Sequence, residues 1–367
     1  MKFSRRLPLI LAMLAAFSAR AEMPVVEVAA DARGFRFAGT ERRFVPWGLN
    51  YDRDSASRLL EDYWLTEWDA VAGDFREMKA LGANVVRVHL QFGRFFPKPG
   101  EPDAENLRLL ARLLALAEET GLYLDVTGLG CYRKSDVPPW YDALDESGRW
   151  QAQAKFWEAI AATCAKSPAV FCYDLMNEPV VPAGHGKSDD WLGPPFGGPG
   201  GFCYVQRIST DQAERPREEI AARWIEMLTA AIRQHDKTHL VTVGLVDWSL
   251  ALPARLYSGF APEKIAAPLD FVCVHLYPQD GKLDEDLATL AAFARAGKPV
   301  VIEETFPLNA SMETFGKFIE GSRKDAAGWF GFYWGKAPAE LDPKASLQDA
   351  LMKVWLEYFR ASPLRDR

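Results

Sequence analysis

Two acidic segments of this 367-residue chain could supply a pair of catalytic carboxyl groups. Glu178 stands in the segment Asn177-Glu178-Pro179, directly after an apolar run, and Glu303-Glu304 end another apolar run. One carboxyl group that keeps a proton and one that stays ionised can cleave a glycosidic bond with retention of configuration, if they lie about 5–5.5 Å apart. A glutamate from each segment therefore indicates acid–base and nucleophilic chemistry at an anomeric carbon.

The stretches that would position these groups alternate between short apolar runs and amphipathic runs along nearly the whole chain. Alternation of this kind predicts strands and helices in turn. After a short hairpin at 35–44, we expect eight strands near 46–50, 84–90, 122–127, 170–176, 240–246, 271–275, 299–304 and 328–334. We expect helices near 69–81, 105–120, 150–166, 217–235, 283–296, 312–323 and 346–359.

This order predicts the α/β fold class, with a single (β/α)8 TIM barrel, a short N-terminal hairpin and a long loop after strand 4, over residues 22–367. A doubly wound open sheet is the alternative, but it would need a glycine-rich phosphate-binding turn, and the sequence contains no G-x-G-x-x-G. The long loop is 180–216, with the Gly/Pro-rich segment 193–201 inside it. We expect it to overhang the carboxyl-terminal end of the barrel, and an ordinary surface loop is the alternative.

In a barrel of this class, the carboxyl-terminal ends of the strands carry the chemistry. Seven of the eight expected strands carry polar or aromatic residues at or near that end: Asn50 and Tyr51, Arg87 and His89, Asn177 and Glu178, Asp247 and Trp248, His275 and Tyr277, Glu303 and Glu304, and Trp334. Opposite charge or a hydrogen-bond donor keeps a carboxylate ionised, and Arg87 and the phenol of Tyr277 are the expected donors. Adjacent strand residues point to opposite sides, so we expect only one of Glu303 and Glu304 to face the barrel axis.

The first 21 residues have the pattern of an export signal. Lys2, Arg5 and Arg6 precede the apolar run 7–17, and Ala19-Arg20-Ala21 is an A-x-A cleavage site. Loss of these three basic residues and Arg20 would move the formal net charge from -7 to about -11. We therefore expect a secreted or periplasmic monomer that binds neither nucleic acid nor, after cleavage, a membrane.

The chain offers little for metal or cofactor chemistry. Its five cysteines include no C-x-x-C spacing, and its five histidines include no H-x-H pair. We expect no cofactor and no metal. Cys172 and Cys273 lie in strand-like runs and are expected to be buried thiols. A disulfide between Cys131 and Cys203 is possible, because both fall in loops expected on one face.

Six segments, in order along the chain, form a recognisable set: Gly34-Phe-Arg-Phe with Trp47-Gly-Leu-Asn50, Asn84-Val-Val-Arg87, Leu175-Met-Asn177-Glu178-Pro179, Val274-His275-Leu-Tyr277, Lys298-Pro-Val-Val-Ile-Glu303-Glu304, and Trp334. Together they resemble glycoside hydrolase family 5, the cellulase and β-mannanase family. The resemblance implies a retaining β-glycosidase on a (β/α)8 barrel, acting on a β-linked glucan- or mannan-type oligo- or polysaccharide.

The same resemblance implies residue roles. Glu178 would be the acid/base, and Glu304, the later carboxylate of its segment, would be the nucleophile. The implied supporting residues are Asn177 for the sugar 2-hydroxyl, Arg87 and Tyr277 to orient the nucleophile, His275 beside the acid/base, and Trp334 as the floor under the reacting sugar. Asn50, His89 and Trp248 are further candidates for substrate binding, from their places at strand ends.

One position departs from the family pattern. Family members usually carry a histidine at the end of strand 3, where this chain has Thr127. His89 on strand 2 could fill the space. Aromatic residues in the loops are candidate platforms for stacking sugars: Tyr51, Trp64, Trp68, Trp140, Trp191 and Trp248.

Three other functions are compatible with a barrel of this kind. A transglycosylase would use the same two carboxylates and pass the sugar to another sugar instead of to water. A carbohydrate-binding barrel could have lost catalysis, although both carboxylates and their supporting residues are present. A metal-dependent hydrolase would need converging His or Asp ligands, which the scattered histidines do not favour.

Overall fold

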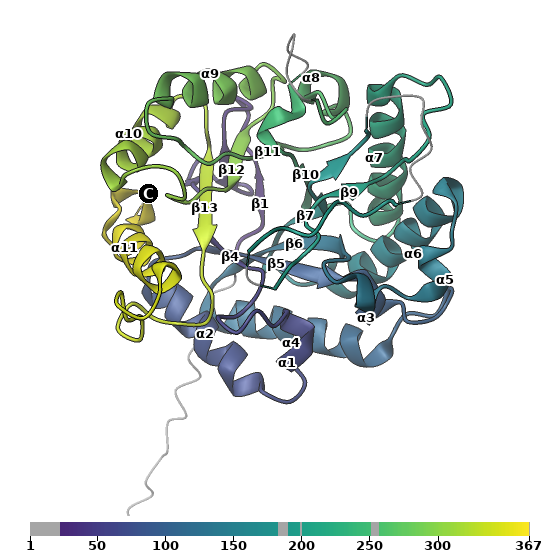
Figure 1. The fold of residues 1–367 in the computed structure, drawn as a ribbon, viewed down its shortest axis with the longest axis horizontal. Coiled ribbons are helices and arrows are strands. Elements are labelled where there is room, and N and C mark those ends of the chain that lie inside the picture. Colours follow the sequence, from purple (N-terminus) through teal and green to yellow (C-terminus); the bar gives the residue numbers. More distant parts are fainter. Residues whose placement is uncertain (1–22, 183–189, 199, 251–256, 367) are drawn as a thin grey trace, which may run out of the picture.

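The computed structural model describes residues 23–182, 190–198, 200–250 and 257–366. Its centre is a parallel sheet of eight strands in the order β10-β7-β6-β5-β4-β13-β12-β11, and the helices surround it (Figure 1). A bridge between Val246 and His275 brings the two edge strands together into a barrel. The strands are β4 (Trp47–Tyr51), β5 (Val85–Gln91), β6 (Tyr123–Gly130), β7 (Val170–Asn177), β10 (Leu240–Gly244), β11 (Val272–His275), β12 (Val300–Glu304) and β13 (Gly328–Phe332). The predicted TIM-barrel class is confirmed.

The seven expected helices are all present, together with shorter ones in the loops. The helices are α1 (Leu60–Tyr63), α2 (Trp68–Ala80), α3 (Phe92–Phe95), α4 (Ala104–Thr120), α5 (Pro139–Asp142), α6 (Glu146–Cys164), α7 (Arg217–Arg233), α8 (Pro262–Ile265), α9 (Leu283–Ala294), α10 (Met312–Ser322) and α11 (Leu347–Ala361). Local chemistry sets their ends: the Asp103 carboxylate accepts the Asn106 backbone N–H at the start of α4, and Gly121 ends that helix at φ 66°.

A small antiparallel sheet lies at the amino-terminal end of the barrel. It consists of β1 (Val26–Val28), β2 (Phe35–Phe37) and β3 (Arg43–Phe44), so the expected hairpin is confirmed and gains one strand. Phe35 packs edge-on against Phe171 and Phe271, with ring centroids 5.2 and 5.1 Å apart. These contacts fill the barrel at the end opposite the carboxyl-terminal strand ends.

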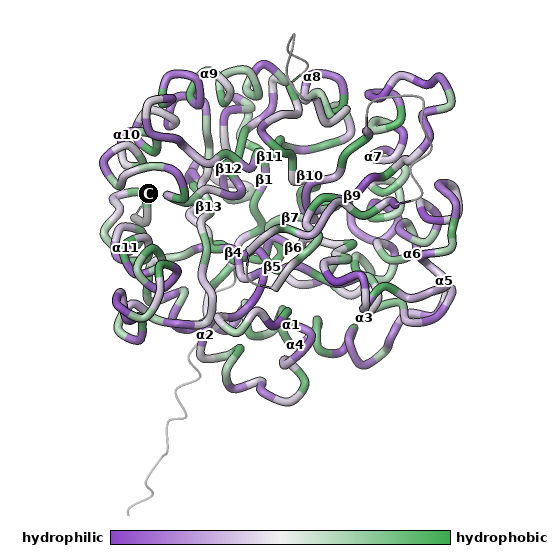
Figure 2. The backbone as a smooth tube through the Cα atoms, in the orientation of Figure 1, coloured by the Kyte–Doolittle hydropathy of each residue, from purple (hydrophilic) through white to green (hydrophobic). Residues whose placement is uncertain are grey.

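The main core lies between the strands and the surrounding helices. The hydrophobic segments concentrate in the central strands, and the hydrophilic ones lie on the outer side of the helices (Figure 2). A close approach at Gly331 fixes α11 against β13, because a Cβ atom there would lie 1.9 Å from Trp355 Cζ2. Trp47 stacks on Phe359 of α11 at 4.5 Å. The last helix is therefore held directly against two neighbouring strands.

The long loop after β7 folds back on itself. Its strand β8 (Pro179–Val180) pairs with β9 (Gln206–Arg207) in parallel. All five cysteines are free thiols and are buried, as expected for Cys172 and Cys273. The disulfide considered between Cys131 and Cys203 is therefore not formed. The expected export signal lies outside the described residues, and no described helix has the length and hydrophobicity to cross a membrane.

Candidate active site

Arg87 on β5 joins the polar side chains at the carboxyl-terminal end of the barrel. It is fully buried. Its Nη1 donates to Glu304 Oε1 at 2.8 Å and to Asn50 Oδ1 at 3.0 Å. Its Nη2 donates to Asp174 Oδ2 at 2.7 Å and to Asn177 Oδ1 at 3.1 Å. One guanidinium thereby fixes four side chains from three other strands, β4, β7 and β12.

Glu178 and Glu304 meet across the barrel mouth. One oxygen of each carboxylate and one ring nitrogen of His275 all lie within 4.8 Å of one another. His275 Nδ1 lies 3.0 Å from Glu178 Oε1 and 3.5 Å from Glu304 Oε2. The Tyr277 hydroxyl donates to Glu304 Oε2 at 2.5 Å. This separation fits direct attack by one carboxylate, whereas inversion through water needs about 6.5–9.5 Å.

The backbone at Glu178 adopts a conformation that is rare for a residue with a side chain. Its φ is 49°, in the left-handed region, and its N–H donates to Gly244 O at 3.1 Å. Such a conformation costs on the order of 1–3 kcal/mol and persists only where the surroundings impose it. Here it lies one residue past the end of β7, where the Glu178 carboxylate reaches His275.

His275 carries a positive charge between the carboxylates. Burial alone would lower the pKa of His275, but the charge of Glu304 and hydrogen bonds with Glu178 and Glu303 raise this pKa to about 10. The protonated ring can donate from Nδ1 to Glu178 and from Nε2 to Glu303 Oε2 at 3.4 Å. The resemblance implied that His275 lies beside Glu178, and its ring is 3.0 Å from the Glu178 carboxylate.

The expectation that only one of Glu303 and Glu304 faces the barrel axis is wrong. The register of β11 and β12 shifts between Val274 and His275, and both carboxylates lie against Arg87, Glu303 Oε2 at 3.5 Å and Glu304 Oε1 at 2.8 Å. They differ in depth instead. The Glu303 side chain is fully buried, whereas Glu304 keeps 11% exposure at the mouth. Of the two, only Glu304 can touch a substrate.

Three carboxyl groups lie below the mouth in a cluster that has the spacing of a metal site: Asp125, Asp174 and Glu303. Arg87 already supplies positive charge to two of them, at 2.7 Å from Asp174 and 3.5 Å from Glu303. Burial and the charge of Glu303 raise the pKa of Asp125 well above its ordinary value, so this carboxyl group keeps a proton. A guanidinium and a proton thus balance the charge that a metal ion would balance.

Thr127, where the resemblance implies a histidine, contacts Asp174 of the buried acidic cluster. Its hydroxyl donates to Asp174 Oδ2 at 2.8 Å, within the buried layer. His89 pairs with Thr127 in the sheet register, but its Nδ1 lies 2.5 Å from the Tyr132 hydroxyl. Burial and the charge of Arg87 lower the pKa of His89 well below its ordinary value, so the ring is neutral. The strand 2 histidine therefore supports Tyr132 instead of Glu178.

Asn50, Asn177 and Gly244 complete the frame of this layer. Asn50 Nδ2 donates to the carbonyl oxygens of Glu303 and Gly331, at 2.8 Å each. Asn177 Nδ2 donates to Tyr204 O at 3.3 Å. Gly244 N donates to Asp174 Oδ1 at 2.7 Å, and a Cβ atom at Gly244 would lie 3.0–3.2 Å from His275, Arg87 and Glu303.

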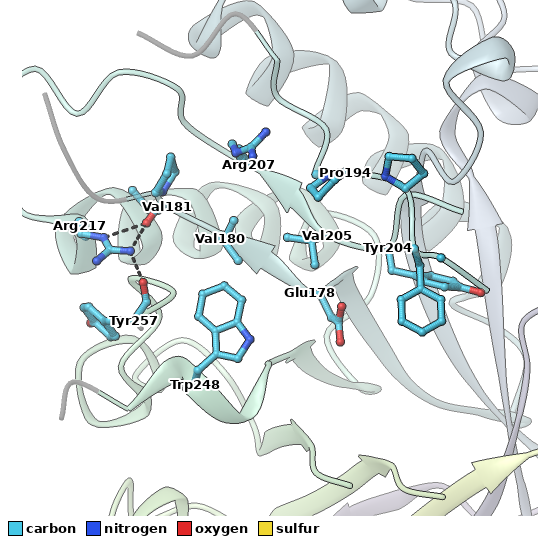
Figure 3. A pocket seen from close by; sticks show the side chains of 15 residues that line it. Glu178, Val180, Val181, Pro194, Tyr204, Val205, Arg207, Arg217, Trp248 and Tyr257 are labelled. Carbon is cyan, nitrogen blue, oxygen red and sulfur yellow. Dashed lines mark hydrogen bonds between the residues drawn. The ribbon is translucent and has the colours of Figure 1, made fainter. Parts of the chain in front are cut away.

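A cavity of about 810 Å³ opens beside Glu178 (Figure 3). The long loop forms one wall, and Trp248 faces that wall from the loop after β10. The described lining residues are Glu178, Val180–Pro182, Gly193–Gly197, Tyr204, Val205, Arg207, Arg217, Trp248 and Tyr257. The long loop therefore borders the candidate site, as expected.

The aromatic residues that the sequence offered as stacking platforms divide into two groups. Tyr51, Trp64 and Trp191 are buried in the core with at most 2% exposure, so they cannot stack on a sugar. Tyr51 instead donates to Asp74 at 2.5 Å. Half-buried Trp68, Trp140, Trp248 and Trp334 keep exposed surface.

Four residues at the mouth were not singled out from the sequence: Asp52, Arg53, Tyr132 and Tyr204. Trp334 Nε1 donates to Asp52 Oδ1 at 2.9 Å, and the Arg53 guanidinium lies 3.9 Å over the Trp334 ring. Tyr132 and Tyr204 pack edge to face at 5.1 Å. The run Asp52-Arg53-Asp54, directly after a strand, was a signal that could have identified the first two.

The family of the chain follows from its sequence match. The family model described as Cellulase (glycosyl hydrolase family 5) matches residues 46–338, so the chain belongs to glycosyl hydrolase family 5. The match includes all ten residues that the sequence proposed for the site, from Asn50 to Trp334.

The relatives with assigned activities share about a quarter of their residues with this chain over the matched segments. Mannan endo-1,4-beta-mannosidase A of Emericella nidulans is 25% identical over 220 residues, covering 54% of this chain and 48% of that protein. The enzyme of the same name from Hypocrea jecorina is 23% identical over 285 residues, covering 66% and 57%. The chain thus spans about half the length of the curated relatives it matches.

Solved structures with the same fold include enzymes that act on mannose-containing substrates. An exo-beta-1,4-mannosidase from Opitutaceae bacterium strain TAV5 has a TM-score of 0.68 at 19% identity, covering 92% of this chain and 63% of that one. The beta-mannanase from the blue mussel Mytilus edulis has a TM-score of 0.60 at 15% identity, covering 93% and 97%. At such identities these similarities establish the fold alone.

Proposed function

We propose that this protein is a retaining β-glycosidase that hydrolyses β-1,4-linked mannan-type saccharides, with β-glucans as the second candidate substrate. The observation that carries the proposal is the approach of the Glu178 and Glu304 carboxylates, whose nearest oxygens lie within 4.8 Å. Family membership supports the reaction class. The two curated mannanase relatives and the mannosidase and mannanase structures favour mannan over glucan.

In the first proposed step, Glu304 attacks the anomeric carbon while the Glu178 proton passes to the departing glycosidic oxygen. The carbon–oxygen bond breaks, and a glycosyl ester forms on Glu304. Arg87 and Tyr277 each donate to one Glu304 oxygen, at 2.8 and 2.5 Å. These two donors orient the carboxylate for attack.

In the second step, Glu178 takes a proton from water, and the resulting hydroxide attacks the anomeric carbon. The ester bond breaks, Glu304 leaves as a carboxylate, and Glu178 is again protonated. His275 lies 3.0 Å from Glu178 and 3.5 Å from Glu304. Its charge stabilises whichever carboxylate is ionised. We expect Asn177 to bind the sugar 2-hydroxyl and Trp334 to contact the reacting sugar, with Asn50 and His89 supporting the site and Trp248 lining the leaving-group side.

The proposal is tested by incubating the purified protein with glucomannan, galactomannan, carboxymethylcellulose, β-1,3-glucan and xylan and sizing the products. We expect cleavage of the mannans, with retention of the anomeric configuration in the first NMR spectra. Failure to cleave any β-mannan or β-glucan would contradict the proposal. Adding mannobiose as an acceptor separates hydrolysis from transglycosylation, since longer products appear only if the sugar accepts the glycosyl group.

Removal of metal ions is expected to leave turnover unchanged. The site acts through two carboxylates, and Arg87 balances the buried acidic cluster. Dialysis against EDTA, followed by rate measurements on galactomannan, tests this expectation. Loss of activity that returns with a divalent cation would contradict it.

Because His275 is charged, we expect the free energy of unfolding to fall as the pH rises into the alkaline range. The pKa of His275 is raised from 6.5 to about 10, so its stabilising contribution is complete below pH 6.5 and is lost as the pH rises through 10. Urea unfolding of the wild type and of His275→Gln at pH 6, 8 and 10 measures this contribution. The free-energy difference between the two proteins should shrink by roughly 2–5 kcal/mol across that range. A constant difference would mean that His275 is neutral.

The proposal places the protein outside the cytoplasm, in the medium or the periplasm, as a monomer after removal of residues 1–21. The leader pattern at 1–21 supports this location.

A further inference from the structure

Arg53, in the loop directly after β4, is buried with part of its hydrogen-bonding capacity unused. Its exposure is 6%. Within the described part of the chain, its Nε and Nη1 atoms make no hydrogen bond, and the nearest carboxylate oxygen to Nε, Asp52 Oδ2, is 3.9 Å away. Buried guanidinium donors are costly to leave unpaired. Two strong donors of this buried guanidinium are therefore left without a protein partner among the described residues.

Arg53 lies on the Glu304 side of the Glu178–Glu304 pair. Its guanidinium carbon lies 3.9 Å over the Trp334 ring, so a sugar on this face would meet the guanidinium instead of the bare indole. Trp334 Nε1 donates to Asp52 Oδ1 at 2.9 Å. The loops after β4 and β13 carry Arg53 and Trp334, and in the strand order these two strands lie across the barrel from β10 and β7. Arg53 thus lies beside Trp334 and Asp52, across the barrel from the strands that border the cavity.

The two sides of the catalytic pair differ. Beyond Glu178 lies the cavity of about 810 Å³ (Figure 3). In the proposed reaction Glu178 protonates the departing oxygen, so this cavity is where the leaving group lies. The sugar that becomes bound to Glu304 lies on the other side, against Asp52 and Arg53, which are each 94% buried with 6% exposure.

We propose that Asp52 and Arg53 form the end wall of the glycone subsite and bind the hydroxyls of a neutral, terminal non-reducing sugar. The enzyme then releases single sugars from chain ends. This inference rests on the proposed function and adds the direction and length of cleavage. An adjacent carboxylate and guanidinium have no net charge, and they offer acceptors and donors together, which suits neighbouring hydroxyls that each donate and accept. A uronic acid would place a second carboxylate beside Asp52.

The test uses the full-length protein with β-1,4-mannohexaose whose reducing end has been converted to the alditol. We expect mannose to be the first product, with the alditol chain shortening by one unit at a time, and the viscosity of soluble mannan to fall little per bond broken. A mixture of internal fragments from the earliest times would overturn the inference and leave the proposed function standing. No cleavage of any β-mannan or β-glucan would overturn the proposed function itself.

Variants of Arg53 test the wall directly. For Arg53→Ala we expect kcat/KM on mannotriose to fall about 100-fold, since two donors to one sugar are lost, and internal fragments to appear from long chains. Arg53→Lys should recover part of the rate, because it keeps the charge but not both donors. Arg223→Ala, an arginine on α7 with 64% side-chain exposure, is the control and should match the wild type.

An unchanged product pattern and rate in folded Arg53→Ala would contradict the assignment. Thermal unfolding of each variant shows which variants are folded. If Arg53→Ala does not fold, the products that the wild type releases from the mannohexaose alditol decide between single-sugar release and internal cleavage. Preference for a mannan chain ending in a uronic acid over one ending in mannose would contradict the neutral terminal sugar.

Discussion

Glu304→Ala is expected to lower kcat by roughly 10⁵- to 10⁶-fold, the scale on which loss of a catalytic nucleophile acts. Without the carboxylate no glycosyl ester can form, although the remaining cavity can hold a small anion. Sodium azide should therefore restore turnover on an aryl β-glycoside and give a glycosyl azide of inverted configuration. The measurement is the rate with and without azide, with the product anomer assigned by NMR.

Two controls make the Glu304 experiment decisive. Glu304→Gln keeps the shape of the side chain that contacts Arg87 and Tyr277. This variant should be inactive but folded, with an unfolding temperature close to that of the wild type. Glu320→Ala removes a glutamate on α10 with 72% side-chain exposure, and it should retain full activity. Absence of azide rescue in a folded Glu304→Ala protein would exclude Glu304 as the nucleophile.

Glu178→Ala is expected to lower the rate on mannan about 10²- to 10⁴-fold, the usual contribution of a general acid. The loss should be far smaller on dinitrophenyl β-glycosides, because a good leaving group departs without a proton. Azide should then attack the glycosyl enzyme in place of water and give a product of retained configuration. The opposite azide anomers from the two variants distinguish the acid/base from the nucleophile.

The comparison that tests Glu178 is the ratio of rates on natural and activated substrates. Equal losses on both would show that Glu178 does not protonate the leaving group. Glu178→Gln should behave like the alanine variant on mannan, since an amide cannot donate the proton. A positive φ at this residue makes Glu178→Gly the variant that relieves backbone strain, so its unfolding temperature separates strain from catalysis.

The barrel could be predicted from the sequence because its signals are periodic and local. The expected strand and helix order is present, and α4 begins and ends at the capping residues that its sequence offers, Asp103 and Gly121. The same holds for the strand ends: Asn50, Arg87, Asn177 and Glu304 form one hydrogen-bonded set, and His275 Nδ1 lies 3.5 Å from Glu304 Oε2. Their positions follow from parallel strands, whose carboxyl ends gather at one end of a barrel.

What could not be predicted depends on contacts between distant segments. The register shift between β11 and β12 brings Glu303 and Glu304 to the same side, and strict alternation along a strand gives no warning of it. Arg53 is only three residues after Asn50, which was expected at a strand end, yet its stacking on Trp334 depends on a residue 281 positions later in the sequence. Burial of Tyr51, Trp64 and Trp191 likewise depends on how loops fold over them.

The aromatic contacts of Phe35 with Phe171 and Phe271 have a consequence for how this protein can be altered. They pack the end of the barrel opposite the candidate site, so these packing contacts and the loops at the mouth lie in separate parts of the molecule. We therefore expect that exchanging loops at the mouth can change substrate choice without disturbing the packing around Phe35. We also expect that substitutions that raise the unfolding temperature through this packing need not slow turnover.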